Sequence, residues 1–138
     1  MWEQFIEKSI EKITKTYGIN ELAFLAMQGK IELQLRDKIA WYLEQNIPNN
    51  CCVKREYNIP GNGRQKCDLA ILDKDNMKPV CLIEFKAHSA ATFEMDYINK
   101  CKNDIAKMQS IAQGITPDPE IYYIFFQTEH QGTLPANN

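Results

Sequence analysis

Two carboxylates and an amine stand at the ends of two apolar segments in the middle of this sequence. Asp68 comes just before the apolar run LAIL (69–72), Glu84 directly follows the run VCLI (80–83), and Lys86 lies two residues further on. Burial of an unpaired carboxylate is costly, so charges placed against buried segments need a partner or a function. The types and spacing of these three side chains suggest that they act together.

A hairpin would bring the two carboxylates together. If the apolar runs pair as antiparallel strands around a turn centred on residue 76, Leu72 faces Val80 and Asp68 faces Glu84. The Cβ atoms of directly opposite residues lie about 4.5–5.5 Å apart. A register shift of one residue would move every side chain of a strand to the other face, so the prediction depends on this pairing.

Carboxylates this close repel each other, and one stays protonated unless a cation lies between them. Mg²⁺ suits such a pair, because it binds one or two carboxylates and completes its shell with water and phosphate oxygens. Lys86 shares a sheet face with Glu84, where it could activate a water or stabilise charge on a phosphate. The three residues together predict metal-assisted phosphodiester hydrolysis, with Mg²⁺ as cofactor and Mn²⁺ as substitute.

A purely structural interpretation is also open. Glu84 and Lys86 could form an exposed ion pair at a strand end, and Asp68 could be a turn residue. The pattern D-x(n)-E-x-K arises often by chance. Its position at the ends of two apolar strands of matched length favours the functional interpretation.

The 138-residue chain has the composition of a soluble globular domain, with 44% hydrophobic and 25% charged residues and a net charge of −2. No apolar run approaches the roughly 20 residues that span a bilayer. The N-terminal segment lacks the basic start and apolar centre of a signal peptide. We therefore expect one cytoplasmic domain over residues 1–138, without a membrane partner. The five cysteines show no C-x-x-C spacing, which argues against structural zinc.

The periodicity of apolar residues predicts the elements around the candidate site. The expected helices cover residues 2–17, 20–27, 30–46 and 93–113, and the expected strands cover 51–59, 66–72, 79–87 and 120–128. The second and third strands are apolar on successive residues, which is typical of central strands covered on both faces. The pattern predicts a single α/β domain in which helices cover a mixed sheet.

In this element order the sequence resembles the PD-(D/E)XK nucleases, the restriction-endonuclease-like superfamily, whose core runs helix, three strands, helix, strand. The resemblance covers residues 29–128, leaving 1–28 as an N-terminal helical extension and 129–138 as a tail. It implies that Asp68 is the metal-binding aspartate of the second core strand. It also implies that Glu84 and Lys86, within IEFKA, are the E-x-K of the third.

The resemblance adds two further ligands. It implies that the Phe85 carbonyl binds the metal and that Glu32, on the first core helix, binds a second ion or a water. The alternative for Glu32 is a helical pair with Arg36, worth a few tenths of a kcal/mol. Cys67 stands where the family has a proline, and the exonuclease-type Q-x-x-x-Y motif is absent, so restriction-like or resolvase-like endonucleases are closer.

Together these observations predict a Mg²⁺-dependent endonuclease that acts on DNA. The alternative is a nucleic-acid-binding or assembly module that keeps the fold without turnover. A small domain that makes double-strand breaks usually works as a symmetric pair, because one active site cuts one strand. We therefore expect a homodimer, and the N-terminal helices carry apolar residues such as Phe24 and Leu25 that could support it.

Basic residues gather near the expected site, although the chain as a whole is slightly acidic. Lys54 and Arg55 lie on the first expected strand, and Arg64 and Lys66 follow the glycines of the turn PGNGRQ (60–65). These side chains are expected to contact phosphates rather than bases. The alternative is a plain solvent turn with ordinary solvated charges.

Overall fold

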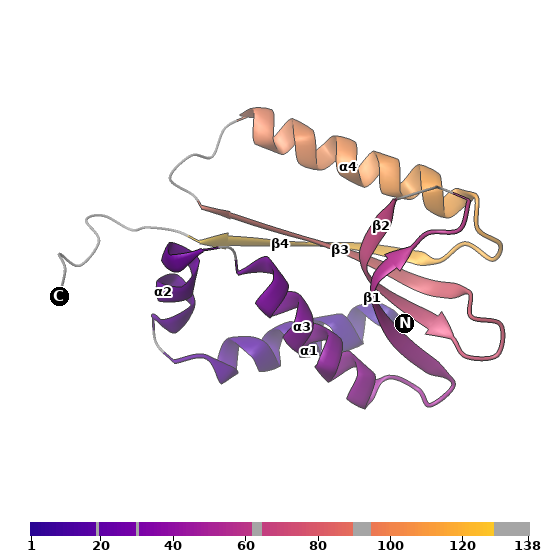
Figure 1. Cartoon of the computed structure of the whole chain (residues 1–138), viewed down its shortest axis with the longest axis horizontal. Helices are drawn as coiled ribbons and strands as arrows, with labels where there is room; N and C mark the ends of the chain where they lie inside the picture. The colour runs from indigo at the N-terminus through magenta and orange to yellow at the C-terminus, as the bar shows by residue number, and fades with distance from the viewer. Residues whose placement is uncertain (19, 30, 62–64, 90–94, 129–138) are drawn as a thin grey trace.

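The computed structural model describes residues 1–18, 20–29, 31–61, 65–89 and 95–128. Within them the chain is an α/β domain with four helices and a four-stranded mixed sheet (Figure 1). The elements are α1 (Trp2–Thr16), α2 (Glu21–Gln28), α3 (Glu32–Asn46), β1 (Cys51–Asn58), β2 (Lys66–Asp73), β3 (Pro79–Ser89), α4 (Met95–Gln113) and β4 (Glu120–Thr128). From α3 onward this is the predicted order, and each predicted boundary agrees within two residues. The α/β class and the mixed sheet are confirmed.

Helix α3 owes its position to a row of apolar residues spaced four apart. Leu35 is 2% exposed, and Ile39 and Leu43 are fully buried. Residues at this spacing lie on one face of a helix, so the row packs as a ridge against the sheet and α1. The Ile47 amide donates to the Leu43 carbonyl and closes the last turn.

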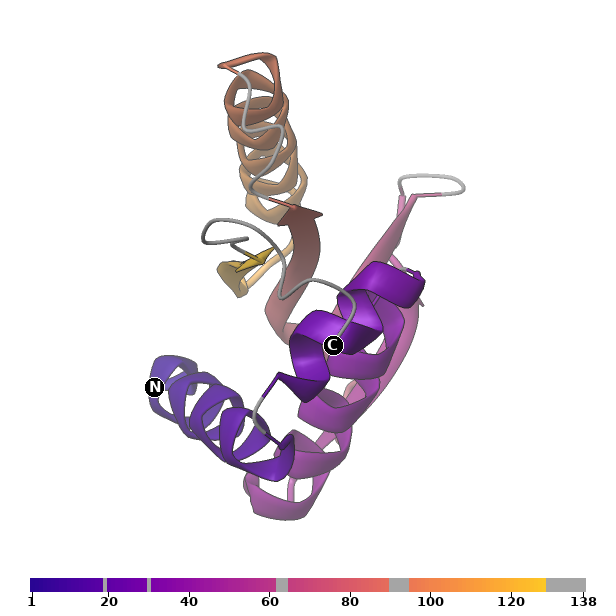
Figure 2. The ribbon, with the colours of Figure 1, turned by 90° about the vertical axis from the view of Figure 1, so that its left-hand side faces the viewer.

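The sheet has the strand order β1-β2-β3-β4. The pairs β1–β2 and β2–β3 are antiparallel, whereas β3 and β4 are parallel and α4 makes the crossover between them. Figure 2 shows that α1 and α3 cover one face of the sheet and that α4 covers the other. Both faces of the two central strands are therefore buried.

Side chains of β2 and β3 point alternately to the two faces of the sheet and contribute to two separate hydrophobic cores. Leu69 and Ile83 belong to the core under α1 and α3. Ala70, Leu72 and Leu82 belong to the core under α4. A strand with cores on both faces needs apolar residues at successive positions, which explains the unbroken apolar runs of the sequence.

The predicted β2–β3 register holds in the centre of the hairpin but fails toward its turn. Leu69 pairs with Ile83 as expected, but the register shifts after Ile71, and Leu72 pairs with Pro79. The predicted pairing of Leu72 with Val80 is therefore wrong. The irregularity lies beside a turn in which Met77 has a positive φ of 57°. This conformation is uncommon for a residue other than glycine, so the sequence did not indicate it.

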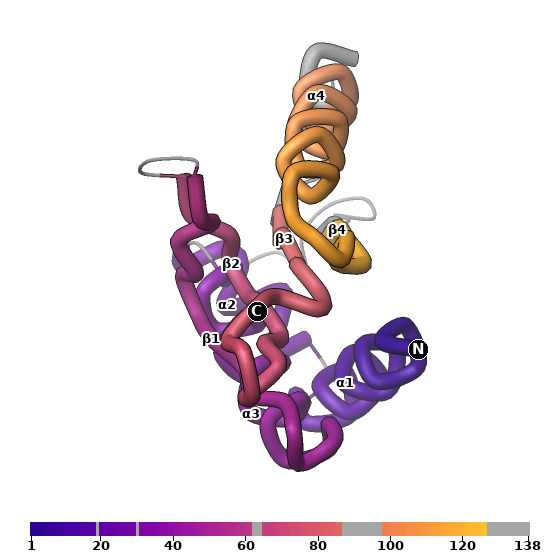
Figure 3. The backbone as a smooth tube through the Cα atoms, turned by 90° about the vertical axis from the view of Figure 1, so that its right-hand side faces the viewer, coloured from indigo at the N-terminus to yellow at the C-terminus, as the bar shows by residue number. Residues whose placement is uncertain are grey.

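The sheet splits at the other end of the same hairpin. Among the described residues, the β2–β3 pairing ends at Leu69 and Ile83. Strand β2 nevertheless stays paired with β1 as far as Lys66, and β3 stays paired with β4 as far as Ser89. Figure 3 shows β1 and β2 leaving together, away from β3 and β4. We call this point the fork. It lies at residues 68 and 84.

The buried row of α3 predicts how its leucines respond to truncation. Leu43→Ala should lower the free energy of unfolding by about 2–5 kcal/mol, because it leaves a cavity in the core. Leu33→Ala is the matched control, since Leu33 lies on the same helix but is 57% exposed, and it should change stability by less than about 1 kcal/mol. Urea unfolding followed by circular dichroism measures both, and equal losses would contradict the assigned face of α3.

Candidate functional site

Asp68 and Glu84 hold the two strands together at the fork through reciprocal contacts. The Asp68 amide donates to Glu84 Oε1 at 2.8 Å. The Phe85 amide donates to Asp68 Oδ2, also at 2.8 Å. The carboxylates thus accept backbone N–H groups at the point where the strand pairing ends. Asp68 and Glu84 therefore lie together across the fork, one residue beyond the last β2–β3 pair, Leu69 and Ile83.

The pair is half-buried and rich in negative charge. Burial, and then the negative charge of Asp68, raise the pKa of Glu84 to about 7. The hydrogen bonds that Glu84 accepts from the Asp68 amide and the Cys67 thiol partly offset this increase. Among the described residues, no salt bridge involves either carboxylate. Two carboxylates therefore lie close together here, and neither forms a salt bridge with the described part of the chain.

Cys67 directly precedes Asp68 on β2. Its Sγ is 3.1 Å from the Leu69 carbonyl oxygen and 3.4 Å from the Ile83 carbonyl oxygen. The side chain is fully buried, and this burial raises the pKa of the thiol far above its ordinary value. Cys67 is therefore a neutral structural thiol that links β2 to β3, and it is not a nucleophile.

Lys86 extends β3 beyond the fork, where it pairs with Phe125 of β4. Side chains alternate along a strand, and Leu82 faces the core under α4, so Glu84 and Lys86 share that face. Lys86 is half-buried, and the salt bridges of the described residues do not include a Glu84–Lys86 pair. The exposed ion pair considered from the sequence is therefore not present.

Glu32 does not join the carboxylate pair. It is the first residue of α3, and α3 covers the face of the sheet opposite to the one that Glu84 shares with Leu82. No three His, Cys, Asp or Glu side chains of the described residues lie together in a way that could hold a metal ion. Arg36, one turn later, pairs with Asp37 at 3.0 Å and with Glu56 at 3.5 Å.

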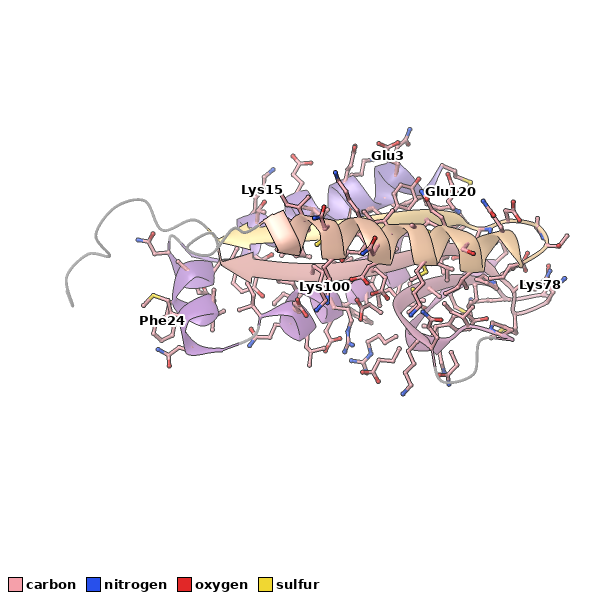
Figure 4. The ribbon with its side chains drawn as sticks, turned by 90° about the horizontal axis from the view of Figure 1, so that it is seen from above. Glu3, Lys15, Phe24, Lys78, Lys100 and Glu120 are labelled. Carbon is pink, nitrogen blue, oxygen red and sulfur yellow. The ribbon has the colours of Figure 1, made fainter. Side chains whose placement is uncertain are left out.

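The predicted phosphate-binding residues differ in their surroundings. Lys54 and Lys66 are exposed on the β1–β2 hairpin, and Lys66 lies two residues before Asp68. Arg55 is engaged in a salt bridge with Asp37 at 3.1 Å. Arg64 lies outside the described residues. Sequence reasoning did not include Lys100 of α4 in the site, but Figure 4 shows that its side chain leaves the helix on the side of β1 and β2.

Sequence reasoning also missed an irregularity directly opposite Asp68. Arg55 pairs with Leu69 and Tyr57 pairs with Cys67, but Glu56 between them has a positive φ of 49°. A non-glycine residue in this conformation is uncommon, and it interrupts the β1–β2 pairing beside the fork. No local signal in the sequence indicates it, because neither glycine nor asparagine occupies the position.

The donor atoms at the fork fit magnesium better than a metal that needs a complete protein shell. The hydrogen bonds across the fork use Oδ2 of Asp68 and Oε1 of Glu84. A pair of carboxylates meets the requirement of Mg²⁺, which keeps several water or phosphate ligands. Structural zinc needs about four protein ligands, and the described residues do not gather them.

Comparisons of the chain with protein-family models, with curated proteins and with solved structures found no match. In the described part of the chain, no helix is long and apolar enough to cross a membrane. The functional argument therefore depends on the geometry of the fork.

The raised pKa of Glu84 predicts that a metal ion and pH affect stability together. Its folded-state pKa of about 7 exceeds the ordinary value of 4.5, so the folded chain binds the proton more tightly than the unfolded chain does. Stability should therefore fall as pH rises from about 4.5 to about 7, by about 1–3 kcal/mol. Millimolar Mg²⁺ should restore much of the loss at the upper end of this range.

Glu84→Gln is the matched control, because it keeps an acceptor oxygen without the charge. Urea unfolding of both proteins across this pH range, with and without Mg²⁺, measures the difference between their profiles. Parallel profiles in the two proteins would show that Glu84 titrates normally.

Proposed function

We propose that this protein is a Mg²⁺-dependent endonuclease that hydrolyses phosphodiester bonds in DNA. The observation that carries the proposal is the carboxylate pair at the fork, which forms no salt bridge among the described residues. The element order from α3 to β4 supports a restriction-endonuclease-like core. The position of Lys86, on the same face as Glu84, supports hydrolytic chemistry.

The side chains at the fork take distinct roles in this proposal. Asp68 and Glu84 hold the ion, and the Phe85 carbonyl is the further ligand that the family resemblance implies. Bound Mg²⁺ would polarise the phosphate and lower the pKa of an attacking water. Lys86 orients that water or stabilises the charge that develops on the phosphate. The arrangement does not require Glu32.

The open side of the fork offers a path for the nucleic-acid backbone. Strands β1 and β2 diverge there from β3, and α4 lies on the other side of the opening (Figures 2 and 3). Lys54 and Lys66 stand on the hairpin, and Lys100 stands on α4 (Figure 4). Local basic residues of this kind attract phosphates even when the net charge is −2.

The roles of Asp68 and Lys86 predict the outcome of a cleavage assay. Asp68→Ala and Lys86→Ala should each reduce Mg²⁺- or Mn²⁺-dependent cleavage of DNA by at least about 100-fold, since each removes a metal ligand or an electrostatic stabiliser. Asp75→Ala and Lys74→Ala are matched controls at the turn end of the hairpin and should keep full activity. Persistent cleavage by both site variants would remove the assignment.

Calorimetry with Mn²⁺ separates this enzyme from a non-catalytic nucleic-acid-binding or assembly module. The enzyme should bind Mn²⁺, and Asp68→Asn should weaken that binding while keeping an acceptor for the Phe85 amide. A chain that binds nucleic acid but takes up no metal at millimolar concentration would be the module.

The hairpin lysine predicts how DNA binding depends on salt. The double variant Arg64→Ala/Lys66→Ala should weaken binding to all sequences alike and reduce the slope of log K against log salt by about one unit per lost phosphate contact. Its affinity for Mn²⁺ should stay unchanged. Fluorescence anisotropy over a range of salt concentrations measures the slope, and an unaltered slope would show that this turn does not touch DNA.

A further inference from the structure

Trp41 presents a large aromatic surface on the outer side of α3. Its side chain is 65% exposed, although the neighbouring positions Ile39 and Leu43 are fully buried on the inner side. Exposed tryptophan is unusual, and tryptophan is enriched among the residues that dominate the energy of protein interfaces. The position of Trp41 therefore indicates a docking surface.

The indole stands between two hollows of side-chain size. The first, toward β1, measures about 300 Å³, and the second, toward α1, measures about 380 Å³. Beside Trp41, the first is lined by Asp37, Ala40, Glu44, Val53 and Arg55, and the second by Lys12, Ile13, Thr16, Asp37, Lys38, Tyr42 and Gln45. The projecting indole of one copy could therefore fill a hollow on the same surface of a second copy.

The charged residues on either side of Trp41 could also pair with those of a second copy. Lys38 precedes the tryptophan by three residues, Glu44 follows it by three, and both are exposed. If two α3 helices cross antiparallel at Trp41, Lys38 of each copy lies level with Glu44 of the other. A parallel crossing would instead bring like charges together.

Existing contacts hold both charged side chains in place. Glu44 Oε2 accepts the Val53 amide at 2.7 Å, which fixes this carboxylate beside the first hollow. The Lys38 ammonium lies 5.4 Å from the centre of the Tyr17 ring. Such positioning reduces the entropy that the two side chains lose when a partner binds.

We propose that a second copy of this chain docks on α3, in a symmetric homodimer centred on Trp41. Each indole enters a hollow beside the partner's tryptophan, and two Lys38–Glu44 pairs flank the axis. An isologous contact of this kind uses the same patch on both subunits. Because α3 and α4 cover opposite faces of the sheet, the dimer leaves the open side of the fork accessible. The proposal does not depend on the nuclease activity.

The exposed apolar side chains of α2 offer a different surface. Phe24 is 59% exposed and Met27 is 56% exposed. Helix α2 carries Glu21 as its charged residue and no lysine or arginine, so it lacks the paired charges that flank Trp41. Phe24 therefore supplies the control for an aromatic truncation that leaves the dimer intact.

Sedimentation velocity on the whole chain tests the proposal. The wild-type chain should be a dimer at micromolar concentration. Trp41→Ala should raise the dimer Kd by about 30-fold or more, as for a residue at an interface centre, while Phe24→Ala leaves it unchanged. Lys38→Glu and Glu44→Lys should each weaken the dimer, and the double variant Lys38→Glu/Glu44→Lys should restore it, because it re-forms both pairs in the opposite sense.

Three results would overturn the proposal. The first is a wild-type chain that stays monomeric at high micromolar concentration. The second is a dimer that Trp41→Ala leaves intact, or that Phe24→Ala dissociates, which would assign the contact to α2. The third is a charge-swapped double variant that is no more dimeric than either single variant. Circular dichroism confirms that each variant is folded.

Discussion

The two backbone hydrogen bonds that the Asp68 and Glu84 carboxylates accept across the fork are the constraint on which the rest of this structure depends. A sheet that splits leaves backbone N–H groups without the partners that strand pairing gave them, and buried N–H groups are rarely left unpaired. Here the Asp68 and Phe85 amides find carboxylate oxygens across the fork. The side chains that close this gap are also those that concentrate negative charge, so folding and candidate chemistry involve the same atoms.

Because Asp68 both accepts a backbone hydrogen bond and carries a charge, different substitutions remove different contributions. Alanine at position 68 removes a charge and also leaves the Phe85 amide without its acceptor. Asparagine keeps an acceptor oxygen and removes the charge alone. Differences between these two variants therefore separate the structural contribution of Asp68 from its electrostatic one. The same comparison applies to Glu84, whose raised pKa reports the cost of holding a second carboxylate in a half-buried position.

Local patterns in the sequence were sufficient to predict the helices and strands and the pairing at the centre of the β2–β3 hairpin. Unbroken apolar runs predict strands with a core on each face, and two runs of matched length bring Asp68 and Glu84 together. The predicted pairing of Leu72 was wrong because the register shifts between Ile71 and Leu72, and no residue type in the sequence indicates this irregularity. The position of Glu32 relative to the sheet was also beyond the sequence pattern. Helical periodicity shows which residues of a helix are buried, but not which face of the sheet the helix covers.

Arg36 shows why contacts between separate elements could not be predicted from the sequence. Arg36 is 7% exposed, and its guanidinium contacts Asp37 and Glu56. Glu56 lies twenty residues away, on β1, where its positive φ coincides with an interruption of the β1–β2 pairing. A buried cation therefore fastens α3 to β1 at the position opposite Asp68, next to the point where β2 leaves β3. The fork is thus supported from two sides, by carboxylates that join β2 to β3 and by an arginine that joins α3 to β1. Contacts of this kind arise where separate elements meet, so the pattern within a single element cannot specify them.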